Sequence, residues 1–550
     1  MAKRKSQDSK LDNKKPKKST TNSGIDSSEI TRLTTEIIES AKVNNLVTLL
    51  NEINKVKSKL ISSVDEKTEQ IGRELAVALF KSFQHLLKQG KLKFSASDDE
   101  KKQLVSKWIE DKYSGFKQTI NEFIVAKLTT ETSLQLDLLQ ISLNLIKLES
   151  IYLNSKPKDP YFPIQTYKDL VHALLTSEAG EIMSDGSNDN FIVLEFVDTF
   201  EKHWDLQFYL FNNLFESLNE LKQEKSTQQL QTIFSIIYTI IKNKLLYTND
   251  VEQQQELAST KWISGKLPSI ASKPSHFKAQ YQKAIVSILS YPLLNSQYKS
   301  TLLILHKRIM PYMQQPQSLL DFLTDAYDIE NDIIPLLTLN SLYELMRSYN
   351  LEYPDFYTKL YSLLTPSLMQ SRYRSRFFRL VDLFLTSTHL SANLVASFIK
   401  RLARLSIASG SPSTVIVIPF IYNLLKRHPT CMIMIHNTNV ANKSSSYEDQ
   451  FDPEEQDPLK TQAINSSLWE VETLMSHYHP NIATLAKIFG EPFRKHSYNM
   501  EDFLDWNFQT LLDAEKTRKY KGVAALEFET FDKVFATKDA TSVYAQGWTL

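Results

Sequence analysis

Glycine is scarce in this chain, with 11 glycines among 550 residues. Loops that hold nucleotide phosphates depend on glycine, because it adopts positive φ angles without steric cost and lets the backbone approach a ligand closely. Neither G-x-G-x-x-G nor G-x-x-x-x-G-K-[ST] occurs, and the nearest pair, Gly180 and Gly186, has the wrong spacing. We therefore expect no nucleotide-binding loop.

Cysteine is almost absent as well, since Cys431 is the only one. A single cysteine excludes an internal disulfide and a cysteine-based metal site, and it favours a reducing compartment. His477, His479 and His496 do not have the spacing of zinc ligands, and H-E-x-x-H is missing. Because G-x-S-x-G and a Cys-His pairing are also missing, we expect no catalytic site, no cofactor and no metal.

Long apolar runs are missing too. No stretch approaches the roughly 18 consecutive apolar residues that a membrane-spanning helix needs. The N-terminus is charged from residue 3 and has no apolar core, so it does not resemble a secretory signal. We expect neither a membrane partner nor secretion.

What the chain does contain is helix-forming sequence. Ile30, Leu33, Ile37 and Ala41 share one helical face, which is typical of an amphipathic helix. The same period predicts further helices at 75–87, 104–120, 134–148, 191–221 and 230–246. Polar or proline-rich interruptions predict loops at 155–163 and 177–190. No convincing set of alternating strands is present.

The second half repeats this pattern more regularly. Helices are predicted at 341–350, with Asn340 as N-cap, and from Pro354 to Leu364. Three further helices are predicted over the segments 373–384, 391–406 and 412–429. Pairs of helices recur at about 40 residues, which is typical of HEAT or armadillo repeats. The sequence therefore predicts an all-α fold, an irregular HEAT/armadillo-like α-solenoid.

The N-terminal tail, residues 1–28, is polar and strongly basic, and we expect it to be disordered. Residues 1–20 carry a net charge of +6, so the other 530 residues sum to −5. Two basic clusters suit a bipartite nuclear-localisation signal, and the alternative is a solvated tail that adds solubility. The clusters consist of Lys3, Arg4, Lys5, Lys14, Lys15, Lys17 and Lys18.

Several short runs, found in order between residues 262 and 528, resemble the CCAAT-binding-factor family. They are PYM at 311–313, LDFLTDAYD at 320–328, NLEYPDFYTKLY at 350–361, SFIKRLARL at 397–405, and the series Asp457-Pro458, Ser467-Leu468-Trp469-Glu470 and His477-Tyr478-His479-Pro480. The insert at 437–449 need not follow the family pattern, and the N-terminal half carries no matching motif. After the tail we expect three parts. Residues 29–260 form an N-terminal helical region, and residues 261–528 form a family-like domain with an acidic loop at 437–460. Residues 529–550 form a terminal segment.

The resemblance implies a nuclear and nucleolar factor of small ribosomal subunit (40S) assembly and 18S rRNA maturation. It further implies membership of the small-subunit processome, as a preribosomal particle component that forms a heterodimer with a protein like nucleolar protein 14. Direct contact with pre-rRNA stays open. Composition and periodicity by themselves indicate only a nuclear, all-helical interaction protein.

A series of basic residues on neighbouring helices is the candidate surface for RNA or an acidic partner. If successive helices align, these side chains would form one ridge, and the alternative is an ordinary solvated face. The ridge would consist of Arg372, Arg376, Arg379, Lys400, Arg401 and Arg404.

The acidic loop and the residues after it form the second candidate. Asp457 is expected to cap a helix that starts at Pro458, and His479 to satisfy a backbone group before the helix at Pro480. Trp469 is expected to be a core anchor that holds the loop, or else a partner contact. Glu470 beside it receives no firm assignment. The loop lacks a calcium-binding pattern, so docking is favoured over metal binding.

Two other functional classes remain as alternatives. A karyopherin-like nuclear transport adaptor would also be a helical solenoid, but the basic helices at 372–427 argue against it. A sequence-specific DNA-binding factor would need a basic recognition helix, and none concentrates the necessary residues. The aromatic residues Phe528, Phe531 and Phe535 near the C-terminus could pack on their own domain or dock on a partner.

Overall fold

The computed structural model describes residues 25–63, 65–92, 100–128, 130–154, 161–243, 245–246, 260–263, 268–329, 333–349, 356–387, 389–436 and 449–519. These ranges are helical, and they contain no β-strand beyond one isolated bridge between Ile182 and Asn188. The chain divides into two compact units, Met1–Leu363 and Leu364–Leu550, and each is described by itself. The predicted all-α solenoid is confirmed.

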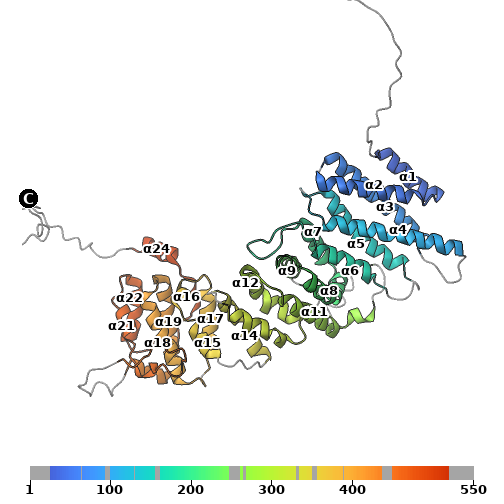
Figure 1. Cartoon of the computed structure of the whole chain (residues 1–550). Coiled ribbons are helices and arrows are strands. Elements are labelled where there is room, and N and C mark those ends of the chain that lie inside the picture. Colours follow the sequence, from blue (N-terminus) through green and yellow to red (C-terminus); the bar gives the residue numbers. More distant parts are fainter. Residues whose placement is uncertain are drawn as a thin grey trace, which may run out of the picture. The chain divides into compact units, whose positions relative to one another are not determined.

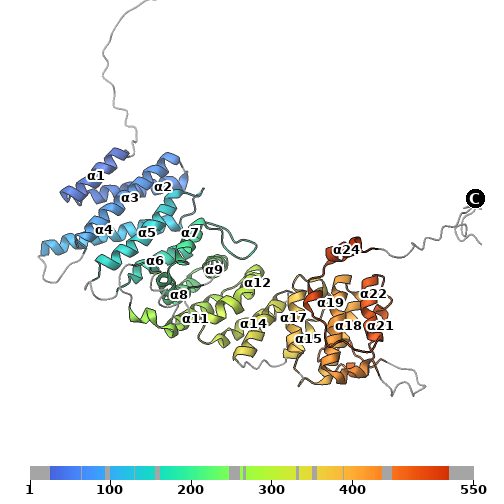
Figure 2. The same ribbon diagram turned by 180° about the vertical axis from the view of Figure 1, so that it is seen from behind.

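The helices from α1 to α11 in the first unit form two layers, and within each layer successive helices pack against each other. Figure 1 shows α1 to α9 stacked in chain order, and Figure 2 shows the same order from behind. One layer contains α1 (Ser27–Ser40), α3 (Glu66–Lys88), α5 (Ser133–Tyr152), α7 (Phe191–Phe200) and α9 (Thr227–Ile241). The other contains α2 (Asn45–Ser62), α4 (Glu100–Val125), α6 (Ile164–Leu175), α8 (Trp204–Glu224) and α11 (Pro274–Leu289). This pattern is that of a helical-repeat solenoid.

The predicted single helix at 191–221 is wrong, because α7 ends at Phe200 and α8 begins at Trp204. His203 between them is extended, with φ −131° and ψ 109°. The Gln207 side chain donates to the Phe200 carbonyl oxygen over 3.0 Å, so the broken backbone regains a hydrogen bond. The buried Gln207 side chain therefore stabilises a break between two helices, although no glycine or proline marks this break in the sequence.

The loop predicted at 177–190 is confirmed, and it is tightly ordered by two buried asparagines. Asn190 caps α7 by accepting a hydrogen bond from the Ile192 N–H over 3.0 Å. Its amide also donates to the Ala179 carbonyl oxygen over 3.0 Å. The Asn188 Oδ1 accepts a hydrogen bond from the Asn190 N–H over 2.9 Å, so side chains of the loop itself hold its backbone.

The first unit continues through α12 (Asn295–Ile304), α13 (Leu320–Tyr327), α14 (Ile334–Tyr349) and α15 (Phe356–Ser362). Asn340 lies inside α14, so its predicted role as an N-cap is wrong. The physical reason is the buried apolar run from Ile334 to Leu337, which packs in the core and starts the helix earlier.

The second unit is built around α19 (Ser411–Arg427), which is buried from Ser411 to Leu425. It packs against α18 (Ala392–Ala408), a helix predicted to begin at Ser391, which is its N-cap. The remaining helices are α16 (Pro366–Gln370), α17 (Arg374–Phe384), α21 (Trp469–Leu474), α22 (Pro480–Ala486), α23 (Glu501–Leu504) and α24 (Phe508–Thr517). Residues 449–468 run between these helices and contact α18 through a short turn at Ala463–Asn465.

Candidate interaction site beside Trp469

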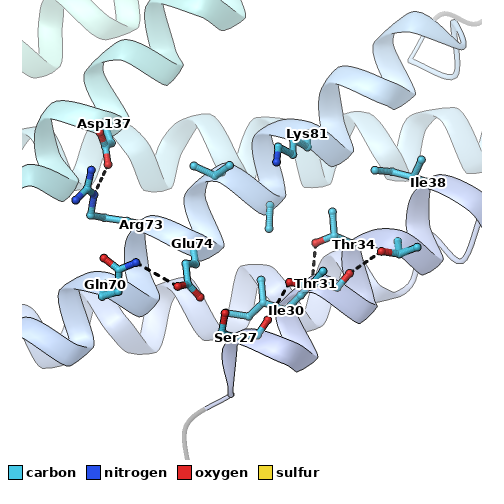
Figure 3. Close-up of a pocket in the computed structure, with 13 residues that line it drawn as sticks. Ser27, Ile30, Thr31, Thr34, Ile38, Gln70, Arg73, Glu74, Lys81 and Asp137 are labelled. Carbon is cyan, nitrogen blue, oxygen red and sulfur yellow. Dashed lines mark hydrogen bonds and ion pairs between the residues drawn. The ribbon is translucent and has the colours of Figure 1, made fainter.

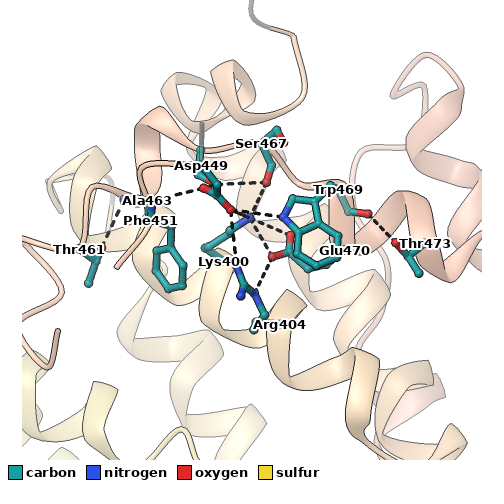
Figure 4. A network of polar contacts seen from close by, with 11 residues as sticks. Lys400, Arg404, Asp449, Phe451, Thr461, Ala463, Ser467, Trp469, Glu470 and Thr473 are labelled. Carbon is teal, nitrogen blue, oxygen red and sulfur yellow. Dashed lines mark hydrogen bonds and ion pairs between the residues drawn. The ribbon is translucent and has the colours of Figure 1, made fainter. Parts of the chain in front are cut away.

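A buried ion pair joins α18 to α21. Lys400 and Glu470 are both fully buried, and the Lys400 Nζ lies 2.8 Å from the Glu470 Oε1. Arg404, one helical turn further on α18, places its Nε 2.9 Å from the same oxygen. Figure 4 shows these side chains converging from the two helices. One buried carboxylate therefore contacts two cations, of which Lys400 is buried and Arg404 is partly exposed.

Asp449 adds a second carboxylate from the segment before α21. Its Oδ2 lies 3.5 Å from the Lys400 Nζ and 3.5 Å from the Arg404 Nη2. Burial opposes ionisation of Asp449, but hydrogen bonds from Ser466 and the Phe451 N–H and the charge of Lys400 outweigh it, so its pKa is lowered. Asp449 therefore stays ionised and ties residues 449–468 to α18.

Two aromatic rings flank this ionic cluster. The Trp469 ring centroid lies 5.4 Å from the Lys400 Nζ and 5.2 Å from the Arg404 Cζ, within cation–π range. Phe451 lies at 5.8 Å and 5.5 Å from the same two atoms. The Trp469 Nε1 also donates to the Asp449 Oδ2 over 3.3 Å. These contacts fix the orientation of the indole.

Trp469 is 41% exposed, so it is not part of the buried core as the expected core anchor would be. The contact with Asp449 does hold the end of the acidic loop, but one part of the ring faces outward. Beside it lies a groove of about 370 Å³. The groove is lined mainly by apolar side chains and comprises Met434, Ile435, Ser467, Leu468, Trp469, Val471, Glu472, Met475, Phe489 and Gly490.

This arrangement has the chemistry of a docking site. A rigid, half-exposed tryptophan next to an apolar groove is typical of the residues that dominate protein interfaces. The two methionines of the groove adapt their shape to different partner side chains. The groove offers an apolar segment a place to bind and holds no arrangement of groups for catalysis.

The predicted basic ridge is only partly a surface. Lys400 is fully buried, so its assignment to an exposed ridge is wrong. Arg404 faces Glu470, while Arg379 binds Glu501 through its Nε and Nη2 over 2.8 Å and 2.6 Å. The reason is that acidic side chains from later segments reach these cations.

The other members of the predicted ridge divide between internal and exposed positions. Arg401 donates to the Leu364 and Pro453 carbonyl oxygens over 3.3 Å and 2.7 Å. Arg376 is half-buried, and burial lowers its pKa. Arg372 alone of these three is exposed. Most of the predicted ridge residues therefore make contacts within the second unit and do not form one continuous cationic surface.

The family-like residues around 457–480 occupy turns and caps. No helix starts at Pro458, because the Asp457 carboxylate accepts the Leu459 N–H over 3.0 Å and forms a tight turn. This hydrogen bond, together with Lys460, lowers the pKa of Asp457. His479 caps α22 as expected, since its Nδ1 accepts the Asn481 N–H over 3.3 Å, and Pro480 is the first residue of that helix.

The first unit offers a different groove, of about 580 Å³, between α1, α3 and α5. Figure 3 shows that its labelled side chains are mostly polar, with Thr31 and Thr34 from α1 on one side and Arg73 and Asp137 on the other. The Arg73 Nε donates to the Asp137 Oδ2 over 2.5 Å, so these charges satisfy each other. The charges of Arg73 and Asp137 are therefore engaged with each other and are not free to bind a ligand in the groove.

For metal sites and membrane-spanning helices, the structure gives findings only on the described ranges. There, no group of three or more His, Cys, Asp or Glu is arranged to hold a metal ion. None of the helices that the structure describes combines the length and the apolar character that crossing a lipid bilayer requires. The nuclear-signal clusters between Lys3 and Lys18, residues 437–448 of the acidic loop and the terminal segment 529–550 lie outside the described residues.

Sequence reasoning missed the buried role of Lys400 and left Glu470 unassigned. A signal was present, because Lys400 shares a helical face with the small residues Ala396, Ser397 and Ala403, all of them buried. A lysine on such a face must find an anion. Nothing local in the sequence identifies Glu470, 70 residues further on, as that anion.

Comparison with known proteins places this architecture in a class. Residues 335–486 match the CBF/Mak21 family, and residues 19–260 match the family described as nucleolar complex protein 4-like, TPR repeats. The protein is thus a helical-repeat member of the CBF/Mak21 class.

Individual relatives define the family more closely. The chain is 42% identical to nucleolar complex protein 4 of Saccharomyces cerevisiae, over 94% of this chain and 96% of that protein. It is 33% identical to nucleolar complex protein 4 homolog B of Xenopus laevis, over 86% and 88% of the two chains. It is 40% identical to the human homolog over 46% of this chain and 49% of that one. The chain belongs to the nucleolar complex protein 4 family, which places it in the nucleolus and in ribosome biogenesis.

Proposed function

We propose that this protein is a non-catalytic scaffold in the maturation of 18S rRNA and the assembly of the small ribosomal subunit. It acts in a heterodimer with a protein like nucleolar protein 14, within the small-subunit processome. The observation that carries the proposal is the preordered Trp469 beside an apolar groove, on a helical solenoid of a nucleolar family.

The physical basis of scaffolding is preorganisation. Lys400, Arg404 and Asp449 hold the Trp469 ring in place before any partner arrives. Binding therefore loses less conformational entropy than it would with a mobile side chain. An amphipathic helix or an extended segment of the partner inserts apolar residues into the groove, and the contact stabilises an assembly intermediate by mass action.

Affinity purification tests this proposal. The tagged full-length chain is purified from nuclear extract at moderate and high salt, and bound proteins and RNA are identified. The proposal predicts that one nucleolar protein survives high salt at equal stoichiometry, while small-subunit precursor RNA is lost. Apolar contacts resist salt, whereas phosphate contacts do not.

Two variants test whether the salt-resistant partner binds at the groove beside Trp469. Trp469→Ala should lose the salt-resistant partner, and Tyr478→Ala should retain it, because Tyr478 is 82% exposed and does not line the groove. Recovery of import factors and diverse cargo without a stoichiometric nucleolar partner would instead identify a transport adaptor.

A further inference from the structure

A short segment after α22, residues 491–498, is held against α19 by side chains of that helix. The Tyr422 hydroxyl donates to the Lys495 carbonyl oxygen over 2.7 Å. Asn423 makes two hydrogen bonds with the Tyr498 backbone, donating to its carbonyl oxygen over 2.8 Å and accepting its N–H over 2.7 Å. We call residues 491–498 the basic loop, and its backbone is fixed although it contains no helix.

Two further contacts complete this support. The Lys426 Nζ donates to the Phe493 carbonyl oxygen over 2.9 Å. The Phe493 ring stacks on Tyr422 with the centroids 4.4 Å apart. The supporting Asn423 is buried, so its hydrogen bonds to the loop are shielded from water. The conformation of the loop is therefore set by the core of the second unit.

The outward side of the basic loop carries consecutive cationic or protonatable side chains. Arg494, Lys495 and His496 are all exposed. In the part of the chain that the structure describes, the Arg494 side chain has no acidic partner, and the Lys495 Nζ contacts only the face of the Tyr498 ring, 3.9 Å from its centroid. Glu491 at the start of the loop is the one carboxylate within it.

Neighbouring cations of the same unit behave differently. Arg427, at the end of α19, binds Asp382 with its Nη1 2.7 Å from the Oδ1. Arg379 binds Glu501 in the same manner. Adjacent like charges repel each other, so the two loop cations do not stabilise the fold by lying side by side. On a backbone that α19 holds in place, they are available to an anionic ligand.

We propose that the basic loop binds the phosphate backbone of RNA, with Arg494 and Lys495 as the principal contacts. This inference rests on the proposed function, in which the RNA is pre-rRNA. Arginine donates to a phosphate through two parallel N–H groups, and lysine supplies a compact charge. The Tyr498 ring lies beside the Lys495 ammonium, with its centroid 3.9 Å from the Nζ, and holds this cation in position for the contact. An acidic peptide would also need apolar contacts, and the exposed side chains of the loop supply almost none.

Fluorescence anisotropy of the full-length chain with a labelled 20-nucleotide single-stranded RNA of mixed sequence tests the proposal. Arg494→Ala with Lys495→Ala should weaken binding about tenfold and reduce the slope of log K against log salt by about 1.4, because each lost contact with a single strand accounts for about 0.7. The loop should remain folded, since α19 holds backbone atoms of Phe493, Lys495 and Tyr498.

A matched control removes two cations elsewhere. Lys101→Ala with Lys102→Ala on α4 changes the net charge equally, and both lysines are exposed. This variant should bind RNA like the wild type. If both variants lose affinity equally, or if the loop variant binds like the wild type, the proposal is overturned. If the loop variant loses affinity for polyglutamate and retains affinity for RNA, the loop is a protein-binding surface instead.

The same variants separate this inference from the proposed function. The loop variant should retain the salt-resistant protein partner, because the basic loop is not part of the groove lining. Loss of RNA affinity with the partner retained supports the inference, whereas absence of any partner in the wild type contradicts the proposed function and not the loop assignment.

Discussion

Lys400 and Glu470 form an ion pair in which neither side chain is exposed, with Nζ and Oε1 2.8 Å apart. Removing the charge of Glu470 leaves the buried Lys400 with only the more distant Asp449 carboxylate, 3.5 Å away. The cost should therefore approach the roughly 3–5 kcal/mol of a broken buried ion pair. Glu470→Gln should therefore strongly destabilise the second unit. Thermal unfolding combined with hydrogen exchange of α18 and α21 measures the effect.

A double substitution separates charge from packing. Lys400→Met with Glu470→Leu removes both charges at similar volume, so it should cost less than Glu470→Gln alone. The Ser467 carbonyl oxygen, which accepts from the Lys400 Nζ over 2.6 Å, still loses its donor. If the single and double variants were equally destabilised, the cost would not come from leaving one buried charge without its partner.

Asp449 should make stability depend on pH. Its pKa is lowered from its ordinary value of 3.8, so its contribution is fully present above that value and is lost as the pH falls through the lower folded-state pKa. Asp449→Asn should cost about 1–2 kcal/mol at pH 7. Melting temperatures from pH 7 to pH 3 should show wild type and variant converging below pH 4, and a constant difference would contradict the assignment.

Gly180 should tolerate no side chain. Its φ is +85°, and a Cβ there would lie 2.6 Å from the Asn188 Oδ1 and 2.7 Å from the Asn190 N. Gly90 is the matched control, because its φ is +69° and a Cβ would meet nothing within 4 Å. We expect Gly90→Ala to cost about 1 kcal/mol through backbone strain alone. Gly180→Ala should cost clearly more in thermal unfolding, and equal costs would contradict the steric argument.

Trp469 should matter more for binding than for folding. Because the ring is 41% exposed, Trp469→Ala should cost only about 1 kcal/mol of stability, through the lost cation–π contacts. Loss of a central interface tryptophan should weaken the partner complex by about 2 kcal/mol or more, about 30-fold. Calorimetric titration of the purified partner checks this, and an unchanged Kd would remove Trp469 from the interface.

Helix positions were largely predictable from the sequence, because apolar periodicity reports which face of a helix is buried. The capping of α18 by Ser391 and of α22 by His479 followed from local residue types. The break between α7 and α8 did not, since it depends on Gln207 reaching back to Phe200. Local signals identify elements, while breaks stabilised by tertiary contacts need the folded structure.

The candidate site was predicted less completely for the same reason. The family-like run identified Trp469 and Glu470, but the partners of Glu470 lie on a helix distant in sequence. The basic ridge failed at Lys400, because formal charge along a helix does not show which cations meet buried carboxylates. Conversely, Arg494 and Lys495 of the basic loop gave no helical pattern and were not singled out.

Pulse-labelling of ribosomal RNA in cells where Trp469→Ala replaces the wild-type protein shows whether the Trp469 groove serves small-subunit assembly. Synthesis of mature 18S rRNA should fall while the large-subunit rRNAs continue to form, and Tyr478→Ala should behave as wild type. Normal 18S synthesis with failing large-subunit rRNA, or equal loss of both, would contradict a scaffold dedicated to the small subunit.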